Sequence, residues 1–346
     1  EQFDGIEGRY KNKTLEAVGS CMRGFFRAPK GKVFVRADYN AIEARVLMWA
    51  AGQTDAVELF HSGEDIYCDM AEYIFGVPAS EIKDGNKAGV LEFSDMRKLG
   101  KDTVLGCGYN MGVATFLAQA ESKGEDTINN IPIRENLALR GQRDKDSFNP
   151  KAWTMASKAV YGYREKYARV PQLWANFDRA AKLAIRERRK YSVRKGLVKF
   201  YMESENLVME LPSGRTIYYP QCELVKRENK WTGVQEDAIR FRTVLDSGKF
   251  VWEYTYGGKL VENAVQAISR DLLVYGMYNA SLAGFELIGT VHDEIISLFN
   301  RLKVTRRTVG KFVKIICQLP NWAIGRTLGT TIPLTAEGEI GERYGK

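Results

Sequence analysis

The sequence is poor in the residue types that build structural metal sites and disulfide frameworks. Two histidines among 346 residues leave little material for a histidine-ligated metal centre. The five cysteines are odd in number, widely scattered and never arranged as a Cys-x-x-Cys pair. They therefore predict neither a disulfide framework nor a zinc site, and they fit a reducing cytoplasm. These cysteines are Cys21, Cys68, Cys107, Cys222 and Cys317.

Long apolar runs and targeting segments are lacking as well. No stretch reaches the roughly 18 apolar residues that a membrane-spanning helix needs, and no signal peptide is found. We therefore expect no membrane partner. The chain begins with Glu1 and not with methionine, so we expect its natural start to lie upstream.

What the chain does have is size, apolar content and positive charge. A length of 346 residues with 45% hydrophobic content suffices for a large core and more than one domain or subdomain. The net charge of +8 favours a polyanionic partner, and nucleic acid is the commonest one. The same charge spread over so large a surface can also serve solubility alone, so charge leaves the partner open.

The spacing of apolar residues predicts a mixture of helices and strands. Residues 33–38, VFVRAD, are expected to form a buried strand, and hairpins are expected at 211–220 and 284–299. The polar, aperiodic segment 121–150 is expected to be a surface insertion. Five segments have helical spacing: 41–49, 65–75, 95–119 (interrupted by glycines), 151–190 and 260–283.

Acidic residues stand at the ends of two predicted strands. Asp38 ends the buried strand, and the second hairpin turns at His292, Asp293 and Glu294, which we expect to lie in the turn and not in the core. If the two strands are neighbours, Asp38 and Asp293 converge. Two carboxylates at such a short distance repel each other unless cations lie between them. Two magnesium ions in such a site can activate a hydroxyl and stabilise a leaving phosphate oxygen. Asp38 could instead cap the following helix, and HDE could be a polar turn.

A third segment, MRKLGKDTVLGCGYNMG at 96–112, adds positive charge. Arg97, Lys101 and Leu105 follow one another at four-residue steps, so they form one helical stripe, basic at its start and apolar further on. The basic residues could hold a polyphosphate, while Leu105 and Tyr109 offer apolar surface to a sugar or base. An ordinary amphipathic helix with a solvated basic edge would show the same pattern.

Together the three segments resemble family A DNA polymerases, phage-encoded members in particular. DYNAIEAR at 38–45 is similar to the first palm motif, RKLGKDTVLGCGY at 97–109 to the fingers helix, and VHDE at 291–294 to the last palm motif. Their order and separation match the family. Intervening stretches such as TYGGKLVENAVQAISRDLL also resemble phage members, so the similarity covers nearly the whole chain and is weakest at 121–150.

The resemblance implies a right-hand polymerase fold of the α+β class, with a palm sheet that carries the carboxylates and a mostly helical fingers subdomain. Residues 1–50 and 250–346 would form the palm, and 51–249 the fingers with the insertion near 121–150. About 30 residues precede the first palm strand, fewer than a domain needs. We therefore expect this chain to be a fragment or one part of a split polymerase, with another polypeptide supplying the thumb and exonuclease functions and no proofreading of its own.

The resemblance also implies the role of single residues in extending a DNA primer with dNTPs, in phage replication in the bacterial host cytoplasm. The implied catalytic residues are Asp38, Asp293, Lys101 and, with a lesser role, Glu294. The implied ligands of two Mg²⁺ ions are Asp38, Asp293 and the backbone carbonyl of Tyr39. The implied nucleotide-binding residues are Arg97 and Lys101 at the triphosphate, Glu43 as the gate against a ribose 2′-hydroxyl, Tyr39, Leu105 and Tyr67. The implied contacts to primer–template DNA are Tyr109 at the template base and Arg45, Gln266 and His292 near the primer 3′ end.

Four positions depart from the family pattern. Leu105 stands where the family has Phe or Tyr, so the contact with the nucleotide sugar lacks an aromatic ring. Tyr67 replaces a histidine that touches phosphate in the bacterial enzyme, and it brings no charge. Lys98 replaces an arginine and loses its fork geometry, and Asn110 follows Tyr109 where glycine is usual.

Other functions compete with this interpretation. A single-subunit RNA polymerase shares the hand architecture and the two aspartates, but Glu43 and the pattern D-Y-N-x-I-E-x-R favour DNA synthesis. A reverse transcriptase is disfavoured because its Y-x-D-D hairpin is missing. A catalytically inactive DNA-binding or assembly subunit could keep the fold, although the joint presence of Asp38, Asp293, Arg97 and Lys101 speaks against decay. A metal-dependent nuclease would leave the helix at 97–109 unexplained.

Overall fold

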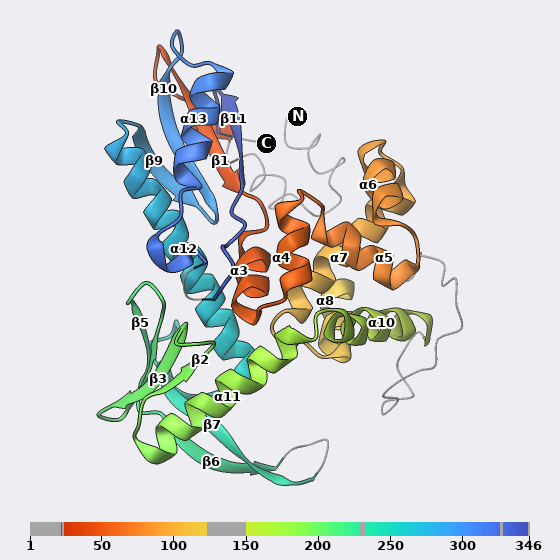
Figure 1. Cartoon of the computed structure of the whole chain (residues 1–346), viewed down its shortest axis with the longest axis vertical. Helices are drawn as coiled ribbons and strands as arrows, with labels where there is room; N and C mark the ends of the chain where they lie inside the picture. Colours follow the sequence, from red (N-terminus) through yellow and green to blue (C-terminus); the bar gives the residue numbers. More distant parts are fainter. Residues whose placement is uncertain (1–21, 23, 123–149, 229–232, 326–327, 345–346) are drawn as a thin grey trace, which may run out of the picture. The chain divides into compact units, whose positions relative to one another are not determined.

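The structure is a computed structural model that describes residues 22, 24–122, 150–228, 233–325 and 328–344 (Figure 1). The insertion expected near 121–150 lies almost wholly outside these residues. Within them, every helix is too short or too polar to cross a membrane. The chain divides into two compact units: unit 1 takes residues from 1–42, 269–320 and 334–346, and unit 2 takes residues from 43–268 and 321–333.

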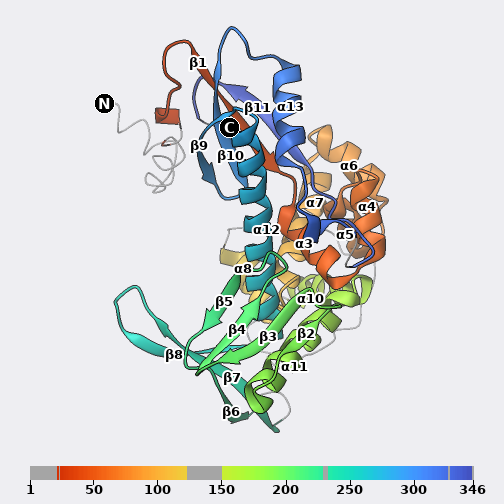
Figure 2. The ribbon, with the colours of Figure 1, turned by 60° about the vertical axis from the view of Figure 1, so that its left-hand side comes forward.

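Unit 1 is built on a four-stranded antiparallel sheet of order β11-β1-β10-β9 (Figure 2). Its strands are β1 (Lys32–Tyr39), β9 (Glu286–Val291), β10 (Glu294–Asn300) and β11 (Ala336–Gly341). The predicted strand at 33–38 and the hairpin at 284–299 are confirmed.

Strand β1 is buried on both faces, which explains its nearly continuous apolar sequence. One face of β1 packs against helix α13 (Arg306–Ile316) and the last turns of α12 (Gly257–Leu282). The packing is close: a side chain at Gly276 would meet the Tyr39 hydroxyl and the Ile316 carbonyl. On the opposite face, Phe34 packs in a small core with Ile296 and Tyr344. Asp38 shares this second face, since successive side chains of a strand alternate.

Unit 2 begins with a set of packed helices. They are α3 (Ile42–Ala51, whose first residue falls in unit 1), α4 (Thr54–His61), α5 (Ile66–Phe75), α6 (Ala79–Lys87), α7 (Leu91–Cys107), α8 (Val113–Ser122), α10 (Pro150–Lys166) and α11 (Arg169–Glu187). The predicted helices at 41–49 and 65–75 are confirmed. The stretch 95–119 starts earlier and breaks between α7 and α8, where the glycines lie, and 151–190 is two helices followed by a strand.

Residues 191–255 of unit 2 form two small antiparallel sheets. The first contains β2 (Tyr191–Val193), β3 (Val198–Glu203), β4 (Asn206–Glu210) and β5 (Thr216–Tyr219). The second contains β6 (Glu223–Glu228), β7 (Gln235–Val244) and β8 (Phe250–Thr255). The hairpin predicted at 211–220 is confirmed, with Gly214 at a φ of +85° in its turn. The sequence predicted no other strand here.

Candidate active site

The predicted convergence of Asp38 and Asp293 is confirmed within unit 1. The N–H of Tyr39 donates to the Asp293 carbonyl at 3.2 Å, which fastens the end of β1 to the turn between β9 and β10. The carboxyl group of Asp38 lies close enough to that of Asp293 to change its pKa. Burial and the nearby Asp38 raise the pKa of Asp293, while a backbone hydrogen bond and His292 act in the opposite direction. Two half-buried carboxylates therefore lie side by side at this end of the sheet.

The expectation that Glu294 lies in the turn is wrong. The turn takes only His292 and Asp293, and it does so because His292 adopts a left-handed φ of 52°. Glu294 is the first residue of β10 and pairs in register with Asp38, so the two side chains lie on the same face. Glu294 is 6% exposed, and its Oε1 has no hydrogen-bond partner.

The unpaired Oε1 of Glu294, near the carboxylates of Asp38 and Asp293, is suited to bind a hard cation. Calcium and magnesium take oxygen ligands, and burial without a partner is costly for an acidic group. Among the described residues, no group of three or more His, Cys, Asp or Glu side chains has the arrangement of a complete metal site. The carboxylate oxygens that the described residues offer to a cation here are those of Asp38, Asp293 and Glu294.

Tyr39 anchors the end of the first strand. Its buried hydroxyl donates to the Ile316 carbonyl at 2.6 Å, and burial raises the pKa of Tyr39 far above its usual range. The side chain is thereby occupied in the interior of unit 1, which leaves the backbone as the part of Tyr39 that could serve a ligand.

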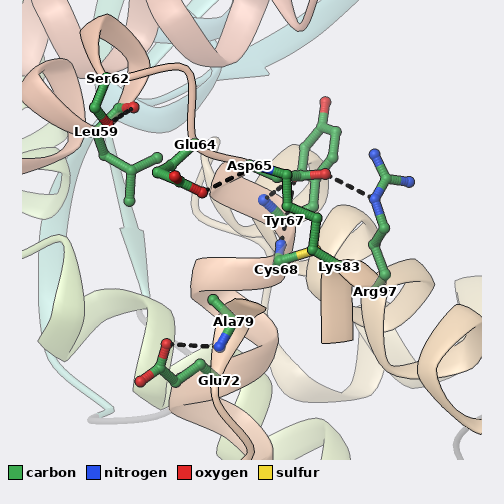
Figure 3. A network of polar contacts seen from close by, with 10 residues as sticks. All are labelled: Leu59, Ser62, Glu64, Asp65, Tyr67, Cys68, Glu72, Ala79, Lys83 and Arg97. Carbon is green, nitrogen blue, oxygen red and sulfur yellow. Dashed lines mark hydrogen bonds and ion pairs between the residues drawn. The ribbon is translucent and has the colours of Figure 1, made fainter. Parts of the chain in front are cut away.

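Within unit 2, Arg97 is held in place by the start of α5 (Figure 3). The carboxylate of Asp65 caps α5: its Oδ1 accepts from the N–H groups of Tyr67 at 2.9 Å and Cys68 at 3.4 Å. Its Oδ2 accepts from Nε of Arg97 at 2.8 Å. The guanidinium also lies 5.4 Å from the centre of the Tyr67 ring. Although burial opposes it, the Asp65 carboxylate raises the pKa of Arg97.

The contact between α5 and α7 depends on a glycine. A Cβ at Gly100 would overlap the backbone carbonyl oxygen of Tyr67, so only glycine lets the two helices approach this closely. Arg97 lies three residues earlier on α7 and reaches Asp65 for that reason. Lys101 is exposed one turn further along α7, and Leu105 is half-buried in the next turn.

Tyr109 and Glu43 form a second pair in unit 2. The Tyr109 hydroxyl donates to Oε2 of Glu43 at 3.1 Å, and burial together with the Glu43 charge raises the pKa of Tyr109 well above its usual range. Asn110 adopts a left-handed φ of 69°, a backbone conformation that glycine and asparagine accept more readily than other residues. A side chain at Gly258 would come within 2.6 Å of the Tyr109 carbonyl, so α12 starts close to this segment.

The expected DNA contacts differ in exposure. Gln266 on α12 and His292 in the β9–β10 turn are exposed. Arg45 is only 7% exposed: its guanidinium donates to the Pro333 carbonyl and lies 4.4 Å from the centre of the Phe60 ring. A role of these three residues at the primer stays a prediction.

Sequence reasoning missed Asp65 and Gly100 as site residues. Asp65 stands directly before a predicted helix, which is the signal of a capping residue. Nothing in the sequence places that cap beside Arg97, because the contact is made by two helices that cross at Gly100.

Known proteins are similar in sequence to this chain. The sequence model of DNA polymerase family A matches residues 12–132. Over 346 residues the chain is 31% identical to the DNA polymerase of Bacillus phage SP02, a match that takes in 99% of this chain and 46% of the phage protein. It is 35% identical over 65 residues to the thermostable DNA polymerase I of Thermus aquaticus, which is 19% of this chain and 8% of that protein.

A solved structure shares the fold. The POL domain of Pol1 from M. smegmatis, in complex with DNA primer-template and dNTP, is similar with a TM-score of 0.52 and 16% identity over 94% of this chain and 42% of that chain. The chain spans less than half the length of the M. smegmatis chain and of the phage polymerase. The predicted α+β polymerase fold is confirmed. The three ordered motifs, the family match and the identity over the whole chain identify this protein as a relative of the family A DNA polymerases.

Proposed function

We propose that the chain carries the catalytic part of a template-directed DNA polymerase, which extends a primer 3′-hydroxyl with dNTPs. The pairing of Asp38 with Asp293 supports this proposal most directly, because two adjacent carboxylates, one at the end of β1 and one in the β9–β10 turn, suit nucleotidyl transfer to a hydroxyl. The similar fold of a POL domain whose structure contains primer-template DNA and dNTP agrees with these substrates.

The carboxylate pair would hold divalent cations. Asp38, Asp293 and the backbone carbonyl of Tyr39 are the groups we assign to two Mg²⁺ ions, which when bound would lower the pKa of the primer hydroxyl and neutralise phosphate charge. The chain's own part is to keep the two carboxylates adjacent. The Tyr39–Asp293 backbone hydrogen bond and the anchor of Tyr39 on Ile316 do this.

The cationic helix would hold the triphosphate. Phosphoryl transfer depends mostly on positioning and on stabilisation of charge. Arg97 is oriented before a nucleotide arrives, because Asp65 and Tyr67 hold its guanidinium. Lys101 supplies a second positive charge one turn further on, where it can stabilise the leaving pyrophosphate.

Selection of deoxynucleotides would fall to Glu43. A carboxylate that crowds the sugar disfavours a 2′-hydroxyl, and the hydrogen bond from Tyr109 keeps Glu43 in one orientation. Leu105 would face the sugar as well, without the aromatic ring that relatives place there. Tyr67 would act through the stacking of Arg97 on its ring.

We further propose that residues 1–50 and 250–346 form the palm and residues 51–249 the fingers. Relatives are more than twice as long, so thumb and exonuclease functions would come from outside these 346 residues, either upstream or in another polypeptide. Because the whole-chain relative is a phage polymerase, we place the reaction in the cytoplasm of a bacterial host.

Primer extension tests the proposal. Asp38→Asn and Asp293→Asn should abolish Mg²⁺-dependent extension of a labelled primer by the chain, or by the assembly co-purified from its native source. Asp84→Asn, an exposed acid on α6, is the matched control and should leave extension unchanged. Undiminished extension by both aspartate variants would overturn the proposal in favour of a non-catalytic subunit. Incorporation of rNTPs as readily as dNTPs would favour an RNA polymerase.

A further inference from the structure

The second small sheet of unit 2 carries rings and arginines on one face. Phe250, Trp252 and Tyr254 alternate along β8, so their side chains share a face. In the antiparallel register, Arg240 on β7 lies opposite Tyr254, and Arg242 lies opposite Trp252. With Arg227 of β6, these residues make up what we call the ring–arginine face: Arg227, Arg240, Arg242, Phe250, Trp252 and Tyr254.

Guanidinium groups and rings alternate across this face. The guanidinium carbon of Arg242 lies 5.8 Å from the ring centre of Phe250 and 5.2 Å from that of Trp252. That of Arg240 lies 4.4 Å from the Trp252 ring. Arg227 lies 4.4 Å from the Tyr254 ring. The arginines thus hold the rings at fixed positions by cation–π contacts.

The rings are exposed although the sheet has another face that is buried. Phe250 is 63% exposed, Trp252 39% and Tyr254 38%. The core contacts of this sheet lie on the opposite face, where Ile239 is fully buried and Phe241 packs edge-on against Tyr219. Folding of the sheet therefore does not account for three large rings in contact with water. Exposed aromatic clusters of this kind mark interaction surfaces.

Two of the arginines form no ion pair with a described residue, although Arg227 lies opposite Glu236 in the register of β6 and β7. Arg240 forms an ion pair with Glu223 at 2.6 Å. No ion pair joins Arg227 or Arg242 to any other residue that the structure describes. A partner for this surface must offer both negative charge and flat apolar faces, and an unpaired nucleic acid strand offers both. A duplex does not, since its bases are already stacked on each other.

We propose that the ring–arginine face binds single-stranded DNA, with bases stacked on Trp252, Tyr254 and Phe250 and with phosphates paired to Arg227 and Arg242. Rings two residues apart on a strand are about 6.8 Å apart, so successive bases of an extended strand can each meet one ring, as on other sheet platforms. The identity of the strand as DNA rests on the proposed polymerase function. The contact itself needs neither the carboxylate pair nor a cation.

Fluorescence anisotropy of the whole chain with a labelled oligo-dT of about 20 nucleotides, in EDTA, tests the proposal. The triple variant Phe250→Leu, Trp252→Leu and Tyr254→Leu keeps apolar bulk and removes the stacking faces. It should bind the oligonucleotide at least about tenfold more weakly, because stacking contributes about 1–3 kcal/mol per base. The double variant Arg227→Gln and Arg242→Gln should reduce the slope of log K against log salt by about 1.4, the value for two phosphates on a single strand.

Two controls separate this surface from the rest of the molecule. Tyr278→Leu on α12 removes a ring that is 61% exposed and should leave affinity unchanged. Binding of a blunt duplex of equal length should not change in the triple variant. Full affinity of a folded triple variant for oligo-dT, or an equal loss on the duplex, would overturn the proposal. Because no metal or nucleotide is present, the result does not depend on whether the chain extends primers.

Discussion

Substitution of Asp65 separates two functions that one carboxylate performs. Its Oδ1 caps α5 and its Oδ2 holds Arg97. Asparagine caps a helix about as well as aspartate, but its neutral amide cannot pair with the guanidinium. We therefore expect Asp65→Asn to release Arg97 and keep the cap, and Asp65→Ala to lose both.

The expected magnitudes follow from the exposure of the pair. The side chains of Arg97 and Asp65 are 32% and 20% exposed, so solvent screens the ion pair and its loss should cost about 1 kcal/mol. Loss of the cap in Asp65→Ala adds about 1 kcal/mol. We expect the free energy of unfolding to fall by about 1 kcal/mol in Asp65→Asn and about 2 kcal/mol in Asp65→Ala, as measured by urea titration.

Nucleotide binding should respond differently from stability. Both variants free the same arginine, so both should raise the KM for dNTP by a similar factor, about five- to tenfold if about 1–1.4 kcal/mol of orientation is lost. Steady-state primer extension measures this. Thr305→Ala, which removes the cap of α13, is the matched control: it should lower stability and leave KM unchanged. An unchanged KM in Asp65→Asn would refute the positioning of Arg97 by Asp65.

Three further predictions concern the carboxylate pair, the helix crossing and the sugar contact. Burial and Asp38 raise the pKa of Asp293 in the folded chain, so the folded state holds a proton more tightly than the unfolded chain. In EDTA this carboxyl should therefore lower the free energy of unfolding as pH rises above its ordinary pKa of about 4, and Asp293→Asn should make the decline smaller in urea titrations. Gly100→Ala should destabilise by about 2–3 kcal/mol through overlap with a backbone carbonyl, whereas Gly310→Ala, with open space around it in α13, should be neutral or stabilise by up to about 1 kcal/mol in thermal melts. Leu105→Phe should change the ratio of dideoxynucleotide to dNTP incorporation, and an unchanged ratio there and in Leu105→Tyr would contradict a sugar contact.

The sequence predicts those parts of the fold whose cause is local. The alternation and length of β1, the Ser-Gly turn near Gly214 and the cap at Asp65 each depend on residues within a few positions. The convergence of Asp38 with Asp293 could also be predicted, because both acids end apolar strands and close acids need a common cation.

The remaining features depend on contacts between distant segments. The sequence predicts Glu294 in the turn because it does not reveal that His292 adopts a left-handed backbone, which shortens that turn to two residues. Strands β6 to β8 were missed because their exposed face alternates rings with charges, so they lack the apolar pattern of a buried strand. The sequence does not reveal that Asp65 is the partner of Arg97, because the two residues meet only where α5 and α7 cross at Gly100.

Tyr39 links three segments of unit 1 that are far apart in the sequence. Its backbone is tied to the Asp293 carbonyl, its hydroxyl to the last turn of α13, and that hydroxyl fills the space beside Gly276. Position 276 is therefore restricted to glycine, because a side chain there would meet the Ile316 backbone carbonyl as well as the Tyr39 hydroxyl, and a shorter residue at 39 would relieve only one of these overlaps. A substitution at this position of α12, more than 230 residues away in the sequence, would press on Tyr39 and so shift the end of β1 that carries Asp38.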